Sequence, residues 1–134
     1  MPDVDLANLQ KLAADELRLL WVNDWYDGPL EAVVEHGGER CLMVLNTGPG
    51  HQTVDVEKPM QWVLFRLSTE QWTEEERWHA LFEVHVGHHW CFHGEPPGEP
   101  AEAHEPKRFY DPFATRAART LGKAVGWVDE MPTR

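Results

Sequence analysis

Apolar and polar positions alternate most regularly over residues 30–45. Two alternating segments, residues 30–36 and 39–45, flank Gly37-Gly38. A glycine pair suits a two-residue hairpin turn, because that turn needs a positive φ at both positions. The resulting register pairs Glu35 with Arg40, Val34 with Cys41 and Ala32 with Met43. The face expected in the core then carries Leu30, Ala32, Val34, Cys41, Met43 and Leu45.

Three other segments have apolar residues at the three- and four-residue spacing of a helix. The first predicted helix starts near Leu6 and ends near Asn23-Asp24. The second starts at Thr73, which precedes three glutamates in a capping-box pattern, and stops at Gly87. The third starts at Asp111-Pro112. Its predicted apolar stripe consists of Phe113, Ala117, Leu121, Ala124, Val125 and Val128.

Residues 60–67 form a third strand candidate, and the short alternating segment 89–93 is a possible fourth. Hairpin-linked strands with helices outside the strand run favour an α+β domain. The sequence therefore predicts a small antiparallel sheet of three to four strands, including the 30–45 hairpin, packed against two to three helices.

The chain has 134 residues, which fits a single domain spanning 1–134. Residues 94–106 are rich in proline and glutamate, so we expect a mobile acidic loop there. No apolar run is long enough for a transmembrane helix, and the N-terminus lacks the basic and apolar pattern of a secretory signal. We therefore expect a cytoplasmic protein that does not bind membranes, with Cys41 and Cys91 as thiols.

The net charge of −11 is unevenly distributed. Residues 1–106 hold 20 acidic and 6 basic side chains, whereas residues 107–134 hold 3 and 6. An acidic surface repels phosphate backbones, so we expect no direct nucleic-acid binding. The charge favours instead a protein partner with a basic surface.

Four histidines and a cysteine lie within residues 85–93. If residues 89–93 are extended, one face carries His89, Cys91 and His93. With a fourth ligand from His85, His88 or His51, this set suits Zn²⁺, or a softer metal such as copper. We expect Cys91 and His93 to be needed for metal binding and His104 not to be. The alternative is an ordinary strand with a polar face, in a protein without a cofactor.

The chain is rich in tryptophan, with seven in total. Three aromatic residues, Trp25, Tyr26 and Trp72, fall at predicted turns, so we expect them to be exposed and to bind a partner. Core packing is expected for Trp21, Trp62 and Trp78, which fall on apolar faces.

Sequence patterns of the common catalytic sites are missing. The chain has no phosphate-cradling glycine loop, GxSxG elbow, HExxH or CxxC motif. The leading hypothesis is a non-enzymatic protein-binding or regulatory module of the inhibitor, antitoxin or immunity type. The alternative is a small metalloprotein, or a metal-dependent enzyme, that uses residues 85–93.

Overall fold

The fold was analysed in a computed structural model, which describes residues 4–25, 29–46, 60–88 and 100–133. The chain divides into two compact units. The sheet unit consists of Met1–Leu67 and Leu121–Arg134, and the helical unit consists of Ser68–Thr120. The prediction of one domain over residues 1–134 stays a prediction. Among the described residues, no helix is both long and apolar enough to cross a bilayer.

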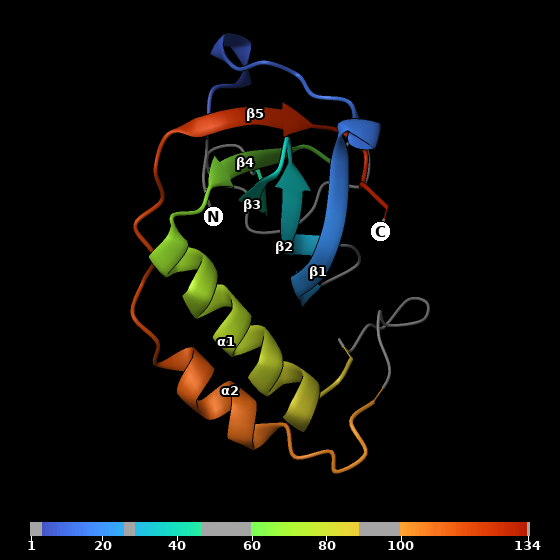
Figure 1. Cartoon of the computed structure of the whole chain (residues 1–134), viewed down its shortest axis with the longest axis vertical. Coiled ribbons are helices and arrows are strands. Elements are labelled where there is room, and N and C mark those ends of the chain that lie inside the picture. Colours follow the sequence, from blue (N-terminus) through green and yellow to red (C-terminus); the bar gives the residue numbers. More distant parts are fainter. Residues whose placement is uncertain (1–3, 26–28, 47–59, 89–99, 134) are drawn as a thin grey trace. The chain divides into compact units, whose positions relative to one another are not determined.

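The sheet unit is a five-stranded antiparallel meander in which every strand pairs with the next one (Figure 1). The prediction of an antiparallel sheet in an α+β protein is confirmed, although the sheet has one strand more than the expected maximum of four. Its strands are β1 Leu17–Trp25, β2 Pro29–His36, β3 Glu39–Leu45, β4 Trp62–Arg66 and β5 Ala124–Val128.

The central hairpin of β2 and β3 has the predicted register. Val34 pairs with Cys41 and Ala32 with Met43. Gly37 and Gly38 have φ values of 58° and 81°, as a two-residue turn of this kind requires. On the predicted core face, Leu30 is only partly buried. The other members are buried: Ala32, Val34, Cys41, Met43 and Leu45.

The predicted first helix is wrong. Its first part contains only two short 3₁₀ turns, η1 Leu6–Asn8 and η2 Ala14–Glu16. The remainder is β1, which pairs along its length with β2. Tertiary pairing outweighs local helical spacing here, because β1 buries Leu17 and Val22 in the core of the sheet unit.

The predicted last helix is also wrong beyond residue 114. Ala124–Val128 forms β5, which pairs with β4 through Val128 opposite Trp62. A helix across this segment would have enclosed Gly122 and Gly126, and glycine disfavours a helix interior. As a strand, the same residues place Val128 in the core, where it is fully buried.

Both edges of the meander are partly covered by other parts of the sheet unit. The segment before β1 runs beside β5 (Figure 1), where Leu12 N–H donates to Trp127 O at 2.8 Å and Trp127 N–H donates to Gln10 O at 3.0 Å. At the other edge, Leu19 N–H donates to Thr133 O at 3.0 Å. These bonds occupy backbone groups that an open sheet edge leaves free to pair with another chain.

The helical unit contains α1 Thr69–His85 and α2 Lys107–Ala114, which lie side by side (Figure 1). The predicted start of α1 at Thr73 is wrong by one turn. Ser68 is the cap, since its Oγ accepts from Gln71 N–H and the Gln71 side chain accepts from Ser68 N–H. The predicted stop at Gly87 is confirmed by its φ of 83°.

The helix α2 begins at Lys107, four residues before the predicted start at Asp111. Pro112 therefore lies inside the helix rather than at its first position. The helix ends two residues later, because Thr115 N–H turns back to Pro112 O at 3.2 Å. A proline near the end of so short a helix removes little of its hydrogen bonding.

Candidate functional site

Most of the predicted binding and metal residues lie outside the residues that the structure describes. Trp25 is the last residue of β1, and its ring lies outside what the structure describes. The same holds for all of Tyr26 and for the three metal candidates of the predicted fourth strand, which are His89, Cys91 and His93. That strand and the binding roles stay predictions.

Trp72 and His85 are described, and both belong to α1. Trp72 lies inside the helix rather than on a turn, and it is half-buried. His85 is the last residue of α1, is half-buried, and its carbonyl oxygen accepts a hydrogen bond from Glu105 N–H at 2.8 Å. Within the described ranges, no three His, Cys, Asp or Glu side chains converge as a metal site would require.

Aromatic rings dominate the core of the helical unit, where Trp78, Phe82 and Phe109 are buried together with Val86 and Phe113 packs against them. Trp78 meets Phe109 and Phe113 edge-on, with ring centroids 6.2 and 5.4 Å apart. Phe82 meets Phe109 at 5.3 Å in the same manner. Such edge-to-face pairs are a favoured aromatic geometry, so the rings fix the helical surface that α1 presents.

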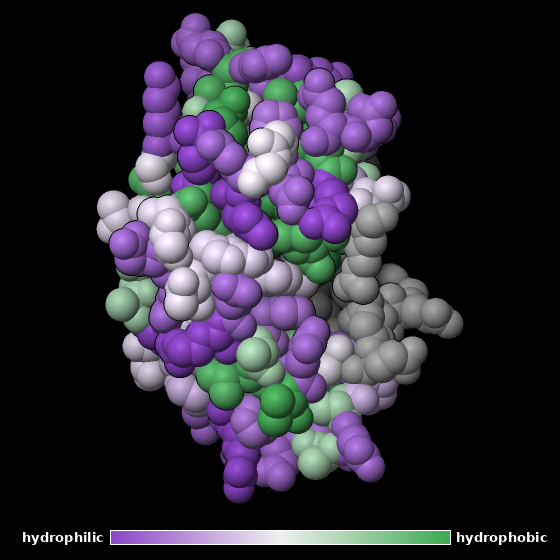
Figure 2. Space-filling model, in the orientation of Figure 1, coloured by the Kyte–Doolittle hydropathy of each residue, from purple (hydrophilic) through white to green (hydrophobic). Residues whose placement is uncertain are grey.

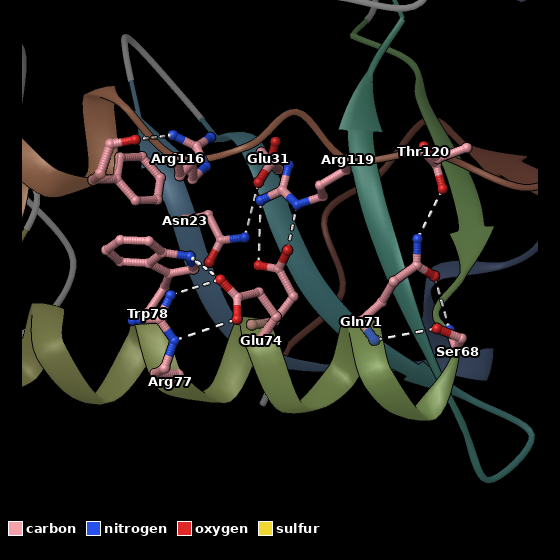
Figure 3. A network of polar contacts seen from close by, with 12 residues as sticks. Asn23, Glu31, Ser68, Gln71, Glu74, Arg77, Trp78, Arg116, Arg119 and Thr120 are labelled. Carbon is pink, nitrogen blue, oxygen red and sulfur yellow. Dashed lines mark hydrogen bonds and ion pairs between the residues drawn. The ribbon is translucent and has the colours of Figure 1, made fainter.

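Carboxylates on α1 are held by neighbouring cationic groups (Figure 3). Glu74 accepts from Arg77 at 2.7 Å and from Trp78 Nε1 at 2.9 Å. The hydrogen bond from Arg77 lowers the pKa of Glu74. The Arg77 guanidinium also lies over the Trp78 ring, 4.3 Å from its centroid. These contacts keep Glu74 ionised and fixed in position.

Glu75 is the buried acidic residue of α1, and Arg119 is its partner. The glutamate is 3% exposed and Arg119 forms two hydrogen bonds with its carboxylate oxygens. In the same segment, Gln71 Nε2 donates to Thr120 O at 2.8 Å (Figure 3). These hydrogen bonds hold residues 119–120, which follow α2, against α1. Sequence reasoning missed this pair, because 44 residues separate its members.

The remaining candidates for chemistry are weak as catalytic groups. Burial raises the pKa of the Cys41 thiol to about 11, so it stays protonated and unreactive near neutral pH. The carboxylates of Asp24 and Glu31 belong to residues that sit opposite each other on β1 and β2. Glu31 accepts a hydrogen bond from Asn23 at 2.9 Å. This arrangement is typical of cross-strand structure rather than of an acid–base pair.

The exposed side of α1 is the most distinctive described surface. Glu76, Ala80 and Glu83 recur at the spacing of one helix face, and all three are exposed. Beside them lies Val84, a large apolar residue with 62% of its surface exposed. On the face of the molecule seen in Figure 2, hydrophilic residues likewise surround smaller hydrophobic patches.

Comparisons with protein-family models, with curated proteins and with solved structures found no match to this chain.

Proposed function

We propose that this protein is a non-enzymatic protein-binding or regulatory module of the inhibitor, antitoxin or immunity type. Its partner has a basic surface, and its own contact surface is the exposed acidic side of α1. The observation that carries this proposal is a set of exposed carboxylates on α1: Glu76 and Glu83 share one face of the helix beside the exposed Val84, and Glu70 is exposed in the first turn.

The charges on this surface are only partly neutralised within the protein. Glu83 accepts from His79 Nε2 at 2.8 Å. Neither Glu70 nor Glu76 forms an ion pair with a basic side chain among the described residues. Exposed carboxylates of this kind remain available to guanidinium and ammonium groups of a partner.

An apolar centre beside charged groups is the usual composition of a protein interface. Val84 supplies such a centre near the C-terminal end of α1. Trp72 lies four residues before Glu76 and is therefore its neighbour on the helix surface. Trp25 and Tyr26 remain further candidates for the same role.

The net charge of −11 supports a partner of opposite charge and disfavours nucleic acid. Complementary charges accelerate the encounter of two proteins, and salt reduces this acceleration. A cytoplasmic location fits the buried, protonated thiol of Cys41, because reducing compartments keep such thiols unpaired.

Affinity capture from extracts of the source cells, with three forms of the protein as bait, tests the proposal. The first form is unchanged, and the second carries Glu70→Lys, Glu76→Lys and Glu83→Lys. The third is a control with the same change in charge at exposed positions outside α1, namely Asp15→Lys, Glu102→Lys and Glu130→Lys. Circular dichroism verifies that all three are folded.

We expect one partner of basic surface to bind the unchanged protein and the control, and to be lost from the α1 variant. Equal loss from both variants would mean that only net charge matters. Undiminished capture by the α1 variant would place the interface elsewhere. Either result contradicts the assignment of the surface to α1.

A further inference from the structure

The chain that precedes α2 returns to the end of α1. Ala101 N–H donates to Val86 O at 3.0 Å, and Glu105 N–H donates to His85 O at 2.8 Å. Two backbone hydrogen bonds thus fix residues 101–105 beside the last residues of α1. They bring His104 next to His88, although 16 positions separate the two in the sequence.

The two imidazole rings are in direct contact. Their centroids are 5.8 Å apart and their planes are inclined by 33°. The Nδ1 atom of His88 is shielded from solvent and has no hydrogen-bond partner in the part of the chain that the structure describes. His104, by contrast, is exposed and free to adjust its side chain.

A buried nitrogen without a partner is costly, since almost all buried polar atoms in proteins form a hydrogen bond or bind a water or ion. The neutral imidazole nitrogen that lacks a proton carries a lone pair, which is the usual ligand for late transition metals. The position of a second imidazole beside it supplies another such ligand.

The ring separation is close to that of two histidines on one metal ion. With Zn–N bonds of about 2.0–2.1 Å, two rings on a tetrahedral ion have centroids roughly 5 Å apart. The observed 5.8 Å differs from this by an amount that a small rotation of the exposed His104 closes. Simple ring packing also occurs at such distances, and the experiment must separate the two.

The carboxylates next to His104 in the sequence favour a cation. Glu102 is exposed, and Glu105 is exposed and paired with Arg108 at 2.6 Å. Negative charge near a site attracts a divalent ion and offsets part of the cost of its dehydration.

We propose that His88 and His104 bind a divalent late transition metal ion, of which Zn²⁺ is the representative, with water completing its coordination. Bound there, the ion joins the end of α1 to the segment before α2. The site requires none of His89, Cys91 and His93. It makes His104 a ligand, whereas the sequence pattern predicts that His104 is not needed for metal binding. It is also independent of the acidic surface on α1.

The test is calorimetric titration of untagged, metal-free, full-length protein with ZnCl₂ at pH 7.5. We expect saturable binding of one ion, weakened at least tenfold by His88→Ala and by His104→Ala. The matched control is His79→Ala, because His79 lies on α1 and its Nε2 is already bonded to Glu83. This control should bind as the unchanged protein does.

A second comparison uses Cys91→Ser with His93→Ala. This double variant should retain zinc binding if His88 and His104 form the site. Loss of binding in the double variant together with full binding by His104→Ala would overturn the proposal. Absence of any binding by the unchanged protein would overturn it as well.

Because His104→Ala can disturb the local fold, the unchanged protein also provides a direct signature. Nitrogen NMR of the histidine rings should show Nδ1 of His88 shifting when zinc is added. A ring nitrogen of His104 should shift together with it, whereas those of His79 should not. Zinc-dependent shifts confined to other histidines would contradict the site.

Discussion

The sheet unit and the helical unit are stabilised in different ways. The sheet unit has a mainly aliphatic core spread over five strands. Backbone hydrogen bonds between four pairs of neighbouring strands stabilise it as well. The helical unit depends on fewer buried side chains, mainly Trp78, Phe82, Val86 and Phe109, and on the ion pair of Glu75 with Arg119. The loss of one buried side chain should therefore remove a larger share of the stability of the helical unit than of the sheet unit.

This difference bears on function, because the proposed binding surface lies on α1. Its carboxylates keep their spacing only while α1 stays packed on α2. Contacts such as those of Phe82 and Arg119 thus position the surface without belonging to it.

The largest effect is expected from Phe82→Ala. The Phe82 side chain is 7% exposed and packs on Phe109, so its removal should lower the free energy of unfolding by about 3–5 kcal/mol. Urea unfolding followed by circular dichroism measures this loss. The control Val84→Ala, on the same helix but exposed, should change stability by less than about 0.5 kcal/mol. A loss below about 1 kcal/mol for Phe82→Ala would mean that the aromatic core contributes little.

The second largest loss of stability is expected from removal of the Arg119 guanidinium. Arg119→Met removes the guanidinium that pairs with the buried carboxylate of Glu75, which should cost about 3 kcal/mol. Changing Glu75→Leu as well removes the uncompensated charge, so the double variant should regain much of this loss. A double-mutant cycle by urea unfolding measures the coupling. Simple additivity of the two changes would show that the pair is not coupled.

A pH effect is expected in the sheet unit. Burial raises the pKa of Cys41 from its ordinary value of 9.0 to about 11. Between these values the unfolded chain loses the proton while the folded protein keeps it, so stability falls as pH rises. The total loss should be about 2–3 kcal/mol.

Unfolding of the unchanged protein and of Cys41→Ala, measured between pH 8 and pH 11, isolates this contribution. At pH 8 the substitution should cost stability because it leaves a cavity. The difference between the two proteins should then shrink as pH rises past 9.0. A difference that stays constant over this range would contradict the account of the Cys41 thiol.

The smallest effect concerns the covered edge of β5. A Cβ atom at Gly126 would lie 2.8 Å from Leu12 Cδ1 and 3.0 Å from Gln10 O. Gly126→Ala should therefore push the segment before β1 away, at a cost of about 1–2 kcal/mol. Amide hydrogen exchange should accelerate at Leu12 and Trp127, whose N–H groups form the bonds at this edge. Unchanged exchange at both would show that the segment accommodates the methyl group.

The turn and the register of the β2–β3 hairpin could be predicted, since they depend on local sequence alone. The strands β1 and β5 could not. Their apolar residues also fit a helical spacing, and only pairing with β2 and β4 decides between the two structures. The start of α1 was a missed local signal, because Ser68 and Gln71 have the spacing of a capping box.

The candidate site was less predictable than the fold. The contact of His88 with His104 and the pairing of Glu75 with Arg119 both join segments distant in the sequence. No local pattern marks either one. Composition did indicate an acidic protein, but only the helix geometry of α1 places Glu76 and Glu83 on one exposed face.

The central claim is that the exposed acidic side of α1 is a binding surface for a basic partner. Its most direct test is the association rate constant of the captured partner, measured between 50 and 500 mM NaCl for the three bait proteins. The account predicts a rate that falls steeply with salt for the unchanged protein and the control, and a slow, salt-insensitive rate for the α1 variant. Identical rates and salt dependence for the control and the α1 variant would contradict it.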